Sequence, residues 1–279
     1  MIETSDLKKV YKNGTVALDG ISINIPDRVT AIIGRNGAGK TTFARIVSTQ
    51  LMPTSGNARV NGLDILKDTK KIRNIMVSIP QEASPIGVLT PMEQVKLFLV
   101  GRGMSVNEAN TVSSATLDEL GLREFKNSPS DMLSGGMKRK VFVCMALAAN
   151  PDVVFLDEPT TGLDPISRFE VWSAVKQLKG DVILTTHYME EAENLSDRVI
   201  LFEKGKVLED GTVKTLLSRF KGKVRVELHH GDNYDVKVGS MKIKYVDSRD
   251  AEDYVIEGNT VKAITLDDVF LIHGVEVES

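Results

Sequence analysis

The sequence has little that would support a secreted or membrane-spanning protein. Its single cysteine, Cys144, cannot form an internal disulfide, and its place in the apolar run 141–149 predicts a buried, inert thiol. That run is the longest in the chain, is far shorter than the roughly 20 residues that cross a bilayer, and predicts a buried helix. The first residues lack both the basic start and the apolar stretch of a secretory signal. We therefore expect the protein to stay in the cytoplasm.

The charge of the chain disfavours a further class of partner. A net charge of −3, with both signs mixed along the sequence, gives no basic field that would draw the protein onto nucleic acid. The hydrophobic fraction of 42% and the charged fraction of 26% are those of an ordinary globular protein. We therefore expect no nucleic-acid partner.

The order of apolar segments predicts an α/β fold. Residues 29–33 form a compact apolar strand, which is followed by a glycine-rich loop and by a helix-forming stretch from Lys40 onward. Further apolar strands are expected at 75–79, 153–156 and 182–184, separated by helical segments. This alternation is typical of a mostly parallel sheet covered on both faces.

Two additions to this sheet are expected. Residues 1–30 predict antiparallel strands, because Asn13-Gly14 is a hairpin signal and apolar residues alternate with polar ones after it. Helical patterns replace strands between residues 85 and 149 and predict an inserted helical subdomain.

The composition changes near the end of the chain. After a helix expected at 213–220, short alternating stretches predict a small β-rich appendage. We therefore expect one domain over residues 1–220 and an accessory domain over 221–279. Because the appendage lies beyond every motif expected to act in nucleotide binding or hydrolysis, a chain cut at Lys221 is expected to fold and to bind nucleotide.

The strongest motif is GRNGAGKT at residues 34–41, which fits the phosphate-loop pattern G-x-x-x-x-G-K-[ST]. Glycine amides can wrap around phosphate oxygens, and the following helix points its positive end at the same anion. Lys40 is expected to neutralise the β- and γ-phosphate oxygens of a nucleoside triphosphate, and Thr41 to bind Mg²⁺. The alternative, a glycine-rich turn with a surface lysine, is disfavoured by the flanking strand and helix. The expected nucleotide-binding residues of the loop are Gly34, Asn36, Gly37, Ala38, Gly39, Lys40, Thr41 and Thr42.

A pair of carboxylates follows the expected strand 153–156. Asp157 is the better candidate for holding Mg²⁺, usually through a water, and Glu158 for polarising the attacking water. Alone, an acidic pair in this position more often caps a helix that starts at Pro159. The phosphate loop in the same chain favours the catalytic interpretation.

Three more segments resemble motifs of the ATP-binding cassette (ABC) ATPases, and the resemblance spans nearly all of residues 2–220. LSGGM at 133–137 resembles the signature peptide of that family, Gln81 lies where its glutamine loop is found, and His187 follows a strand as its switch histidine does. In isolation, Gln81 could be only a strand end and His187 a structural histidine. Their order and approximate spacing agree with the family.

The resemblance implies a RecA-like core with an antiparallel β subdomain and a helical subdomain, and a division of labour between two copies. Ser134, Gly135 and Gly136 would bind the γ-phosphate held by a second copy of the chain, so that each ATP is sandwiched in a dimer. Gln81 would sense Mg²⁺ and the water, and His187 would contact the γ-phosphate and orient the catalytic glutamate.

Two weaker similarities complete the expected site. GLDP at 162–165 is similar to the D-loop of the family, which places Asp164 at the nucleotide. Tyr11 lies where an aromatic residue of the family stacks on adenine, although it could equally be a surface aromatic of the hairpin.

Other details resemble export-type members, including lipid exporters. Met137 stands where the family most often has glutamine, and SGGMKRK at 134–140 is typical of exporters, as are DPISR at 164–168, TTHYMEEAE at 185–193 and TLDDVFL at 265–271. The resemblance implies an ATPase that powers a separate membrane permease, for export, from the inner face of the cell membrane. An import-type subunit and a soluble non-transport ABC ATPase remain as alternatives.

Overall fold

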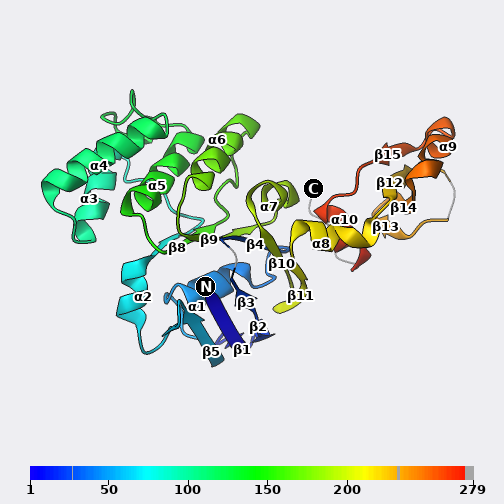
Figure 1. Ribbon diagram of the computed structural model, residues 1–279, viewed down its shortest axis with the longest axis horizontal. Coiled ribbons are helices and arrows are strands. Elements are labelled where there is room, and N and C mark those ends of the chain that lie inside the picture. The colour runs from blue at the N-terminus through cyan, green and yellow to red at the C-terminus, as the bar shows by residue number, and fades with distance from the viewer. Residues whose placement is uncertain (27, 231–232, 274–279) are drawn as a thin grey trace.

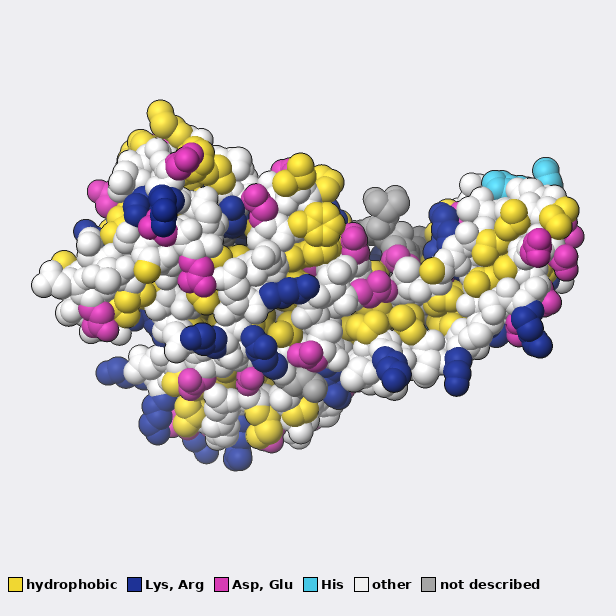
Figure 2. All heavy atoms as spheres, turned by 45° about the horizontal axis from the view of Figure 1, so that its top comes forward, with side chains coloured by type: hydrophobic (Ala, Val, Ile, Leu, Met, Phe, Trp, Pro, Cys, Tyr) yellow, Lys and Arg dark blue, Asp and Glu magenta, His cyan; other side chains and the backbone are white. Residues whose placement is uncertain are grey.

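The computed structural model describes residues 1–26, 28–230 and 233–273, and Figure 1 shows a larger body with an appendage at one end. Residues 231–232 and 274–279 of the expected accessory domain lie outside the described residues. Within the described ranges, no helix is both long and apolar enough to cross a bilayer. Acidic and basic side chains are interspersed over the face seen in Figure 2, so this face carries no basic field.

The core of the larger body is a six-stranded sheet with the strand order β11-β10-β4-β9-β8-β7. Five of its strands run parallel, and β11 pairs with β10 antiparallel. The strand β8 is buried along its whole length, as expected for a parallel strand covered on both faces. The strands are β4 (Val29–Ile33), β7 (Met76–Ile79), β8 (Val153–Asp157), β9 (Asp181–Thr186), β10 (Arg198–Glu203) and β11 (Lys206–Gly211). The mostly parallel sheet predicted from the sequence is therefore confirmed.

An antiparallel sheet covers one side of this core. Its hairpin turns at Asn13-Gly14, as predicted, with the amide of Tyr11 donating to the carbonyl of Thr15 at 2.9 Å. Helix α1 (Lys40–Val47) packs between the two sheets, where Phe43 meets Phe202 edge to face. The strands are β1 (Ile2–Val10), β2 (Val16–Ile21), β3 (Asn24–Ile25), β5 (Ser55–Val60) and β6 (Leu63–Asp64).

Helices pack on the other side of the core. The predicted helical subdomain is confirmed, and its helix α3 begins at Pro91 because Thr90 and Glu93 form a capping box around the helix start. Cys144 is buried in α5 as predicted, and burial raises the pKa of its thiol to about 12, which disfavours the reactive thiolate. The helices of this side include α3 (Pro91–Gly101), α4 (Val106–Glu119), the 3-10 turn Ser130–Met132, α5 (Gly135–Ala149) and α6 (Pro165–Lys176), whereas Ile72 of α2 (Thr69–Ile75) packs in the cluster of α1 and the antiparallel sheet.

The appendage contains the predicted β-sheet and two helices that were not predicted. Its sheet has the order β13-β14-β12-β15, with β12 (Lys223–Leu228), β13 (Val236–Val238), β14 (Met241–Asp247) and β15 (Thr260–Lys262). The remaining helices of the described residues are α7 (Met189–Leu195), α8 (Val213–Leu217), α9 (Ala251–Ile256) and α10 (Leu266–Ile272), with 3-10 turns at Ser218–Phe220 and Ser248–Asp250.

The last of these helices leaves the appendage and returns to the larger body. Helix α10 contacts α7 and α8 (Figure 1). Its residues Leu266, Val269 and Phe270 are buried in the same apolar cluster as the central sheet. The chain therefore crosses between the two regions twice, once after α8 and once before α10.

Candidate nucleotide-binding site

Residues 34–42 form a tight loop between β4 and α1. A Cβ atom on Gly34 would lie 2.3 Å from the carbonyl oxygen of Phe202, and one on Gly39 would lie 2.4 Å from that of Ala17. Gly39 also has a φ of 107°, which side-chain-bearing residues rarely adopt. Both positions therefore require glycine, and the loop leaves its backbone amides at the start of α1, where anions bind.

Lys40 is folded over this loop and is buried. Its ammonium group donates to the carbonyl of Gly34 at 2.7 Å and to that of Arg35 at 3.2 Å. It also lies 3.7 Å from a carboxylate oxygen of Glu158. The phosphate loop and the carboxylate pair, which are more than a hundred residues apart in the sequence, are thus joined through this lysine.

Asp157 lies at the end of β8, opposite the start of α1. The hydroxyl of Thr41 donates to its Oδ1 at 3.2 Å, and the hydroxyl of Thr185 donates to the same oxygen. Burial raises the pKa of this carboxyl, while the hydrogen bonds from Thr185 and Thr41 lower it. A hydroxyl and a carboxylate oxygen side by side are hard ligands of the kind that a phosphate-bound Mg²⁺ takes, so these residues fit that ion.

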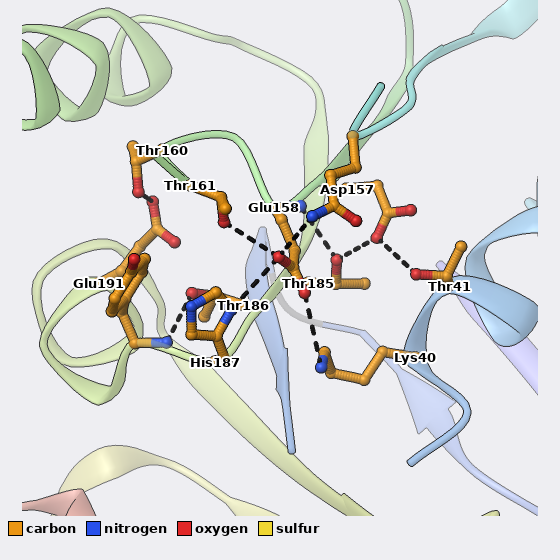
Figure 3. A network of polar contacts seen from close by, with 12 residues as sticks. Lys40, Thr41, Asp157, Glu158, Thr160, Thr161, Thr185, Thr186, His187 and Glu191 are labelled. Atoms are coloured by element: carbon orange, nitrogen blue, oxygen red, sulfur yellow. Dashed lines mark hydrogen bonds and ion pairs between the residues drawn. The ribbon is translucent and has the colours of Figure 1, made fainter. Parts of the chain in front are cut away.

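Glu158 is the centre of the polar network in Figure 3. Its Oε2 accepts hydrogen bonds from the side chains of Gln81 and Thr161, both at 3.0 Å. The Nδ1 of His187 lies 3.2 Å from the same oxygen, and Lys40 lies on the side of the other oxygen. The residues predicted from four separate sequence motifs therefore meet at one carboxylate.

The backbone at Glu158 rules out the helix-cap interpretation. Its φ of 49° lies in the left-handed region, which is uncommon for residues other than glycine and is typical of functional sites. No helix starts at Pro159; the next helix, α6, starts at Pro165 and is capped by the Asp164 side chain, which accepts the amide hydrogen of Ser167.

A cavity of 260 Å³ lies beside the loop. Tyr11 lies at its rim and its hydroxyl is 3.1 Å from that of Thr42. Gln81 and Glu158 line the same cavity. The sequence analysis missed three lining residues, Thr15 directly before the second strand of the hairpin and Val16 and Ala17 at its start, because no motif marks them.

The signature residues lie away from this cavity. Ser134 caps α5, with its side chain accepting the amide hydrogen of Met137 at 3.3 Å. A Cβ on Gly136 would lie 2.5 Å from Ser167, so a side chain has no room where α5 meets α6. Within one chain these residues do not line the cavity beside Lys40.

The geometry agrees with a known family. A family model described as "ABC transporter" matches residues 18–161, which is more than half of the chain. The chain belongs to the ABC transporter family. It is an ATP-hydrolysing ABC ATPase, as its motifs predicted.

Curated relatives of this ABC ATPase include a drug-resistance protein and a phospholipid-transporting ATPase. The daunorubicin/doxorubicin resistance ATP-binding protein DrrA of Streptomyces peucetius is 40% identical over 235 residues, covering 82% of this chain and 70% of that protein. ABC transporter A family member 10 of Arabidopsis thaliana is 34% identical, and the phospholipid-transporting ATPase ABCA3 of Rattus norvegicus is 36% identical. The matches cover 92% and 74% of this chain, which spans only 29% of the plant protein and 12% of the rat protein.

Solved structures confirm the RecA-like cassette fold. A dimeric ATP-binding cassette in a post-hydrolysis state, bound to ADP and Pi, matches with a TM-score of 0.68 and 27% identity, over 76% of this chain and 98% of that chain. The ATP-binding subunit of an ABC transporter matches with a TM-score of 0.69 and 26% identity, over 79% of this chain and 93% of that chain.

Proposed function

We propose that this ABC ATPase binds MgATP on residues 34–42, hydrolyses it between two copies of the chain, and drives export through a separate membrane permease. The observation that carries the proposal is the meeting of Gln81, His187 and Lys40 at the carboxylate of Glu158, beside the phosphate loop. The names of the relatives, one a drug-resistance protein and another a phospholipid transporter, support export.

In this proposal the phosphate oxygens of ATP replace the backbone carbonyl oxygens of Gly34 and Arg35 as partners of the Lys40 ammonium group. The lysine is already buried and has three oxygen neighbours, so exchanging them for phosphate oxygens requires little movement of the chain. The amides of 34–42 surround the phosphates, and Tyr11 at the rim of the cavity stacks on the adenine.

Thr41, Asp157 and Gln81 would hold Mg²⁺, directly or through water. When bound, Mg²⁺ neutralises negative charge that develops on the transferred phosphoryl group. Thr41 and Asp157 already share a hydrogen bond of 3.2 Å, so the two oxygens lie within reach of a single ion.

Glu158 would polarise the attacking water. Its side chain is buried and lines the cavity beside the phosphate loop, and Gln81 and His187 lie next to its Oε2. His187 is also placed to contact the γ-phosphate once the carboxylate turns toward the water.

The second half of each site would come from a partner copy. Ser134, Gly135 and Gly136 form the start of α5, a helix of 15 residues whose positive end can bind a γ-phosphate. Asp164 of the D-loop lies at the start of α6, close to the signature residues. Because the signature residues do not line the cavity of their own chain, they are available to bind the nucleotide held by the other chain.

The permease would dock on the helical subdomain. Residues 85–89 follow Gln81, and within them the side chains of Ile86 and Val88 are 60% and 80% exposed. Apolar side chains so exposed are expected where another protein binds. A chain held in this way lies in the cytoplasm, on the inner face of the cell membrane.

The test is the variant Glu158→Gln. We expect its hydrolysis rate to fall by about 10²–10⁴-fold, because the amide cannot polarise water, while MgATP still binds. ATP should then remain trapped between residues 34–42 of one copy and 134–136 of the other. Gel filtration with mass detection should show a shift from monomer to dimer with MgATP and no shift with ADP.

The control is a second change, Ser134→Arg, which places a bulky cation at the shared site and should abolish the dimer. Hydrolysis at the wild-type rate in Glu158→Gln would disprove the role of that carboxylate. A variant that binds ATP and stays monomeric would disprove the shared site.

A further inference from the structure

A second buried carboxylate, Glu191 of α7, lies behind the catalytic network. Its Oε1 accepts a hydrogen bond from the hydroxyl of Thr160 at 2.8 Å and one from the indole N–H of Trp172 at 3.0 Å (Figure 3 shows the threonine). The residue is fully buried. Burial raises the pKa of its carboxyl, and the hydrogen bonds from Thr160 and Trp172 lower it.

Glu191 and its two donors come from three different segments of the site. Thr160 lies in the turn that joins Glu158 to the D-loop, Trp172 lies on α6 after the D-loop, and Glu191 itself lies on α7, which begins two residues after His187. A buried acceptor that joins these segments fixes their relative positions, because leaving any of the donors unpaired in the interior is costly.

The turn held by Glu191 is connected directly to the catalytic carboxylate. The carbonyl of Thr160 accepts the amide hydrogen of Leu163 at 3.2 Å, which sets the path of the D-loop. The neighbouring Thr161 donates to Oε2 of Glu158 at 3.0 Å. A shift of this turn would therefore move both the D-loop and a hydrogen-bond donor of Glu158.

Helix α6 also contacts the segment that carries His187. The guanidinium of Arg168 lies 4.5 Å from the ring centre of Tyr188, which follows the histidine. Trp172, one helical turn further along α6, reaches Glu191. The helix that begins at the D-loop thus holds the start of α7 at two points.

We propose that Glu191 is a positioning residue for ATP hydrolysis, which holds the D-loop turn, helix α6 and the His187 segment as one unit. When a second copy of the chain contacts and shifts the D-loop, the positions of His187 and Glu158 then shift with it. This inference rests on the proposed function, and it assigns to Glu191 no contact with the nucleotide.

The test compares Glu191→Leu, which has a similar size and no acceptor, with Glu191→Gln, which keeps an oxygen for the two donors. We expect Glu191→Leu to lower kcat by about 10- to 100-fold, because small misplacements of catalytic groups have effects of this size. KM for ATP should stay within about twofold, because the loop 34–42 is untouched and only transition-state positioning is lost. Glu191→Gln should restore kcat to within about fivefold of the wild type.

Trp172 supplies a spectroscopic readout, because it is the only tryptophan of the sequence. Its emission should shift in Glu191→Leu, where the indole N–H loses its carboxylate partner, and less in Glu191→Gln. A purely structural role would not produce the expected split between kcat and KM.

Leu195→Ala is the matched control for stability. Leu195 is buried on the same helix and contributes to the apolar core. Its replacement should lower the thermal midpoint and leave kcat unchanged at temperatures where the protein is folded. Should Glu191→Leu keep the wild-type kcat, or lose no more kcat than this control, the proposal is overturned.

Two milder variants cover the case in which Glu191→Leu does not fold. Thr160→Val and Trp172→Phe each remove one donor, and each should lower kcat severalfold with KM unchanged; wild-type kcat in both would overturn the proposal. Failure of the proposed function is recognised separately, because Glu158→Gln would then hydrolyse ATP at the wild-type rate.

Discussion

The catalytic cavity and the appendage both contain buried charges, but they use them differently. Where the sheet of the appendage meets α10, Asp268 of that helix is fully buried and accepts from the hydroxyl of Tyr245 at 3.0 Å, with Arg225 at 3.6 Å. Arg225 and Lys262 in turn both pair with Glu227, at 2.7 and 2.9 Å. Two cations thus meet two carboxylates away from the nucleotide cavity, and these contacts hold the fold together.

In the cavity, by contrast, one lysine faces one of two adjacent buried carboxylates. Lys40 lies beside Glu158, which lines the open volume next to the phosphate loop, whereas Asp157 at the end of β8 is held by hydroxyl groups. A network that borders a cavity can exchange its contacts for those of a ligand. The difference predicts that changes in the cavity alter binding and chemistry, whereas changes in the appendage alter stability.

The largest loss of stability is expected when α10, the helix where the two regions meet, is removed. Four of its side chains, Leu266, Val269, Phe270 and Leu271, are at most 4% exposed. Burying each stabilises by about 1.5–3 kcal/mol, so removing all four approaches the roughly 5–15 kcal/mol net stability of a domain. A chain that ends at Lys262 should therefore lose about 10 °C or more of its thermal midpoint.

A chain that ends at His273 keeps α10 and is the control for this truncation. Equal midpoints for the two chains would show that the helix is peripheral. The same reasoning changes our expectation for a chain cut at Lys221, which lacks α10 as well: we now expect it to be strongly destabilised. We propose that α10 belongs with residues 1–220 and that the accessory domain is the sheet and α9 alone.

The second-largest effect is expected on the affinity for MgATP. Lys40→Ala removes the ammonium group beside Glu158 and should weaken MgATP binding by about 100-fold, as expected for a buried charge-assisted contact. Calorimetry should show this loss, while the thermal midpoint without ligand stays near that of the wild type. Lys206→Ala, at an exposed lysine that pairs with Asp19, is the control and should bind normally. Unchanged affinity in Lys40→Ala would disprove the assignment of the phosphate loop.

The smallest effect tests the charge network of the appendage. Tyr245→Phe removes the hydroxyl that donates to Asp268 and should lower the free energy of unfolding by about 1 kcal/mol. MgATP affinity should not change, because the network lies outside the cavity. The control is Tyr234→Phe, at a tyrosine that is 37% exposed. An effect of Tyr245→Phe on ATP affinity would mean that the appendage belongs to the site.

The fold of the central sheet could be predicted because its strands are short, continuous apolar runs with polar boundaries. The predicted strand 29–33 agrees with β4, and the run 153–156 differs from β8 by one residue. The phosphate loop, the carboxylate pair and the signature peptide were recognisable because each function needs several residue types within a few positions. Such motifs can be recognised because the residues that they need lie next to one another in the sequence.

The Glu191 network and the docking of α10 could not be predicted in this way. Glu191 joins segments that are separated by up to 31 residues, and neither Thr160 nor Trp172 carries a motif that points to it. For α10 a local signal existed, because Thr265 and Asp268 form a capping box directly before an apolar run. The surface that the helix covers depends on how α7 and α8 pack, which the sequence pattern does not contain.

The two crossings between the larger body and the appendage also have a mechanical consequence. A domain joined by a single strand can swivel about that joint, but this one is tethered by neighbouring helices, α8 on the way out and α10 on the way back. At the second tether, the amide of Leu266 donates to the carboxylate of Glu193 on α7 at 2.6 Å. A force applied to the appendage would therefore be passed to α7 and α8 through both connections at once. Helix α7 begins two residues after His187, so the force would reach the edge of the catalytic site.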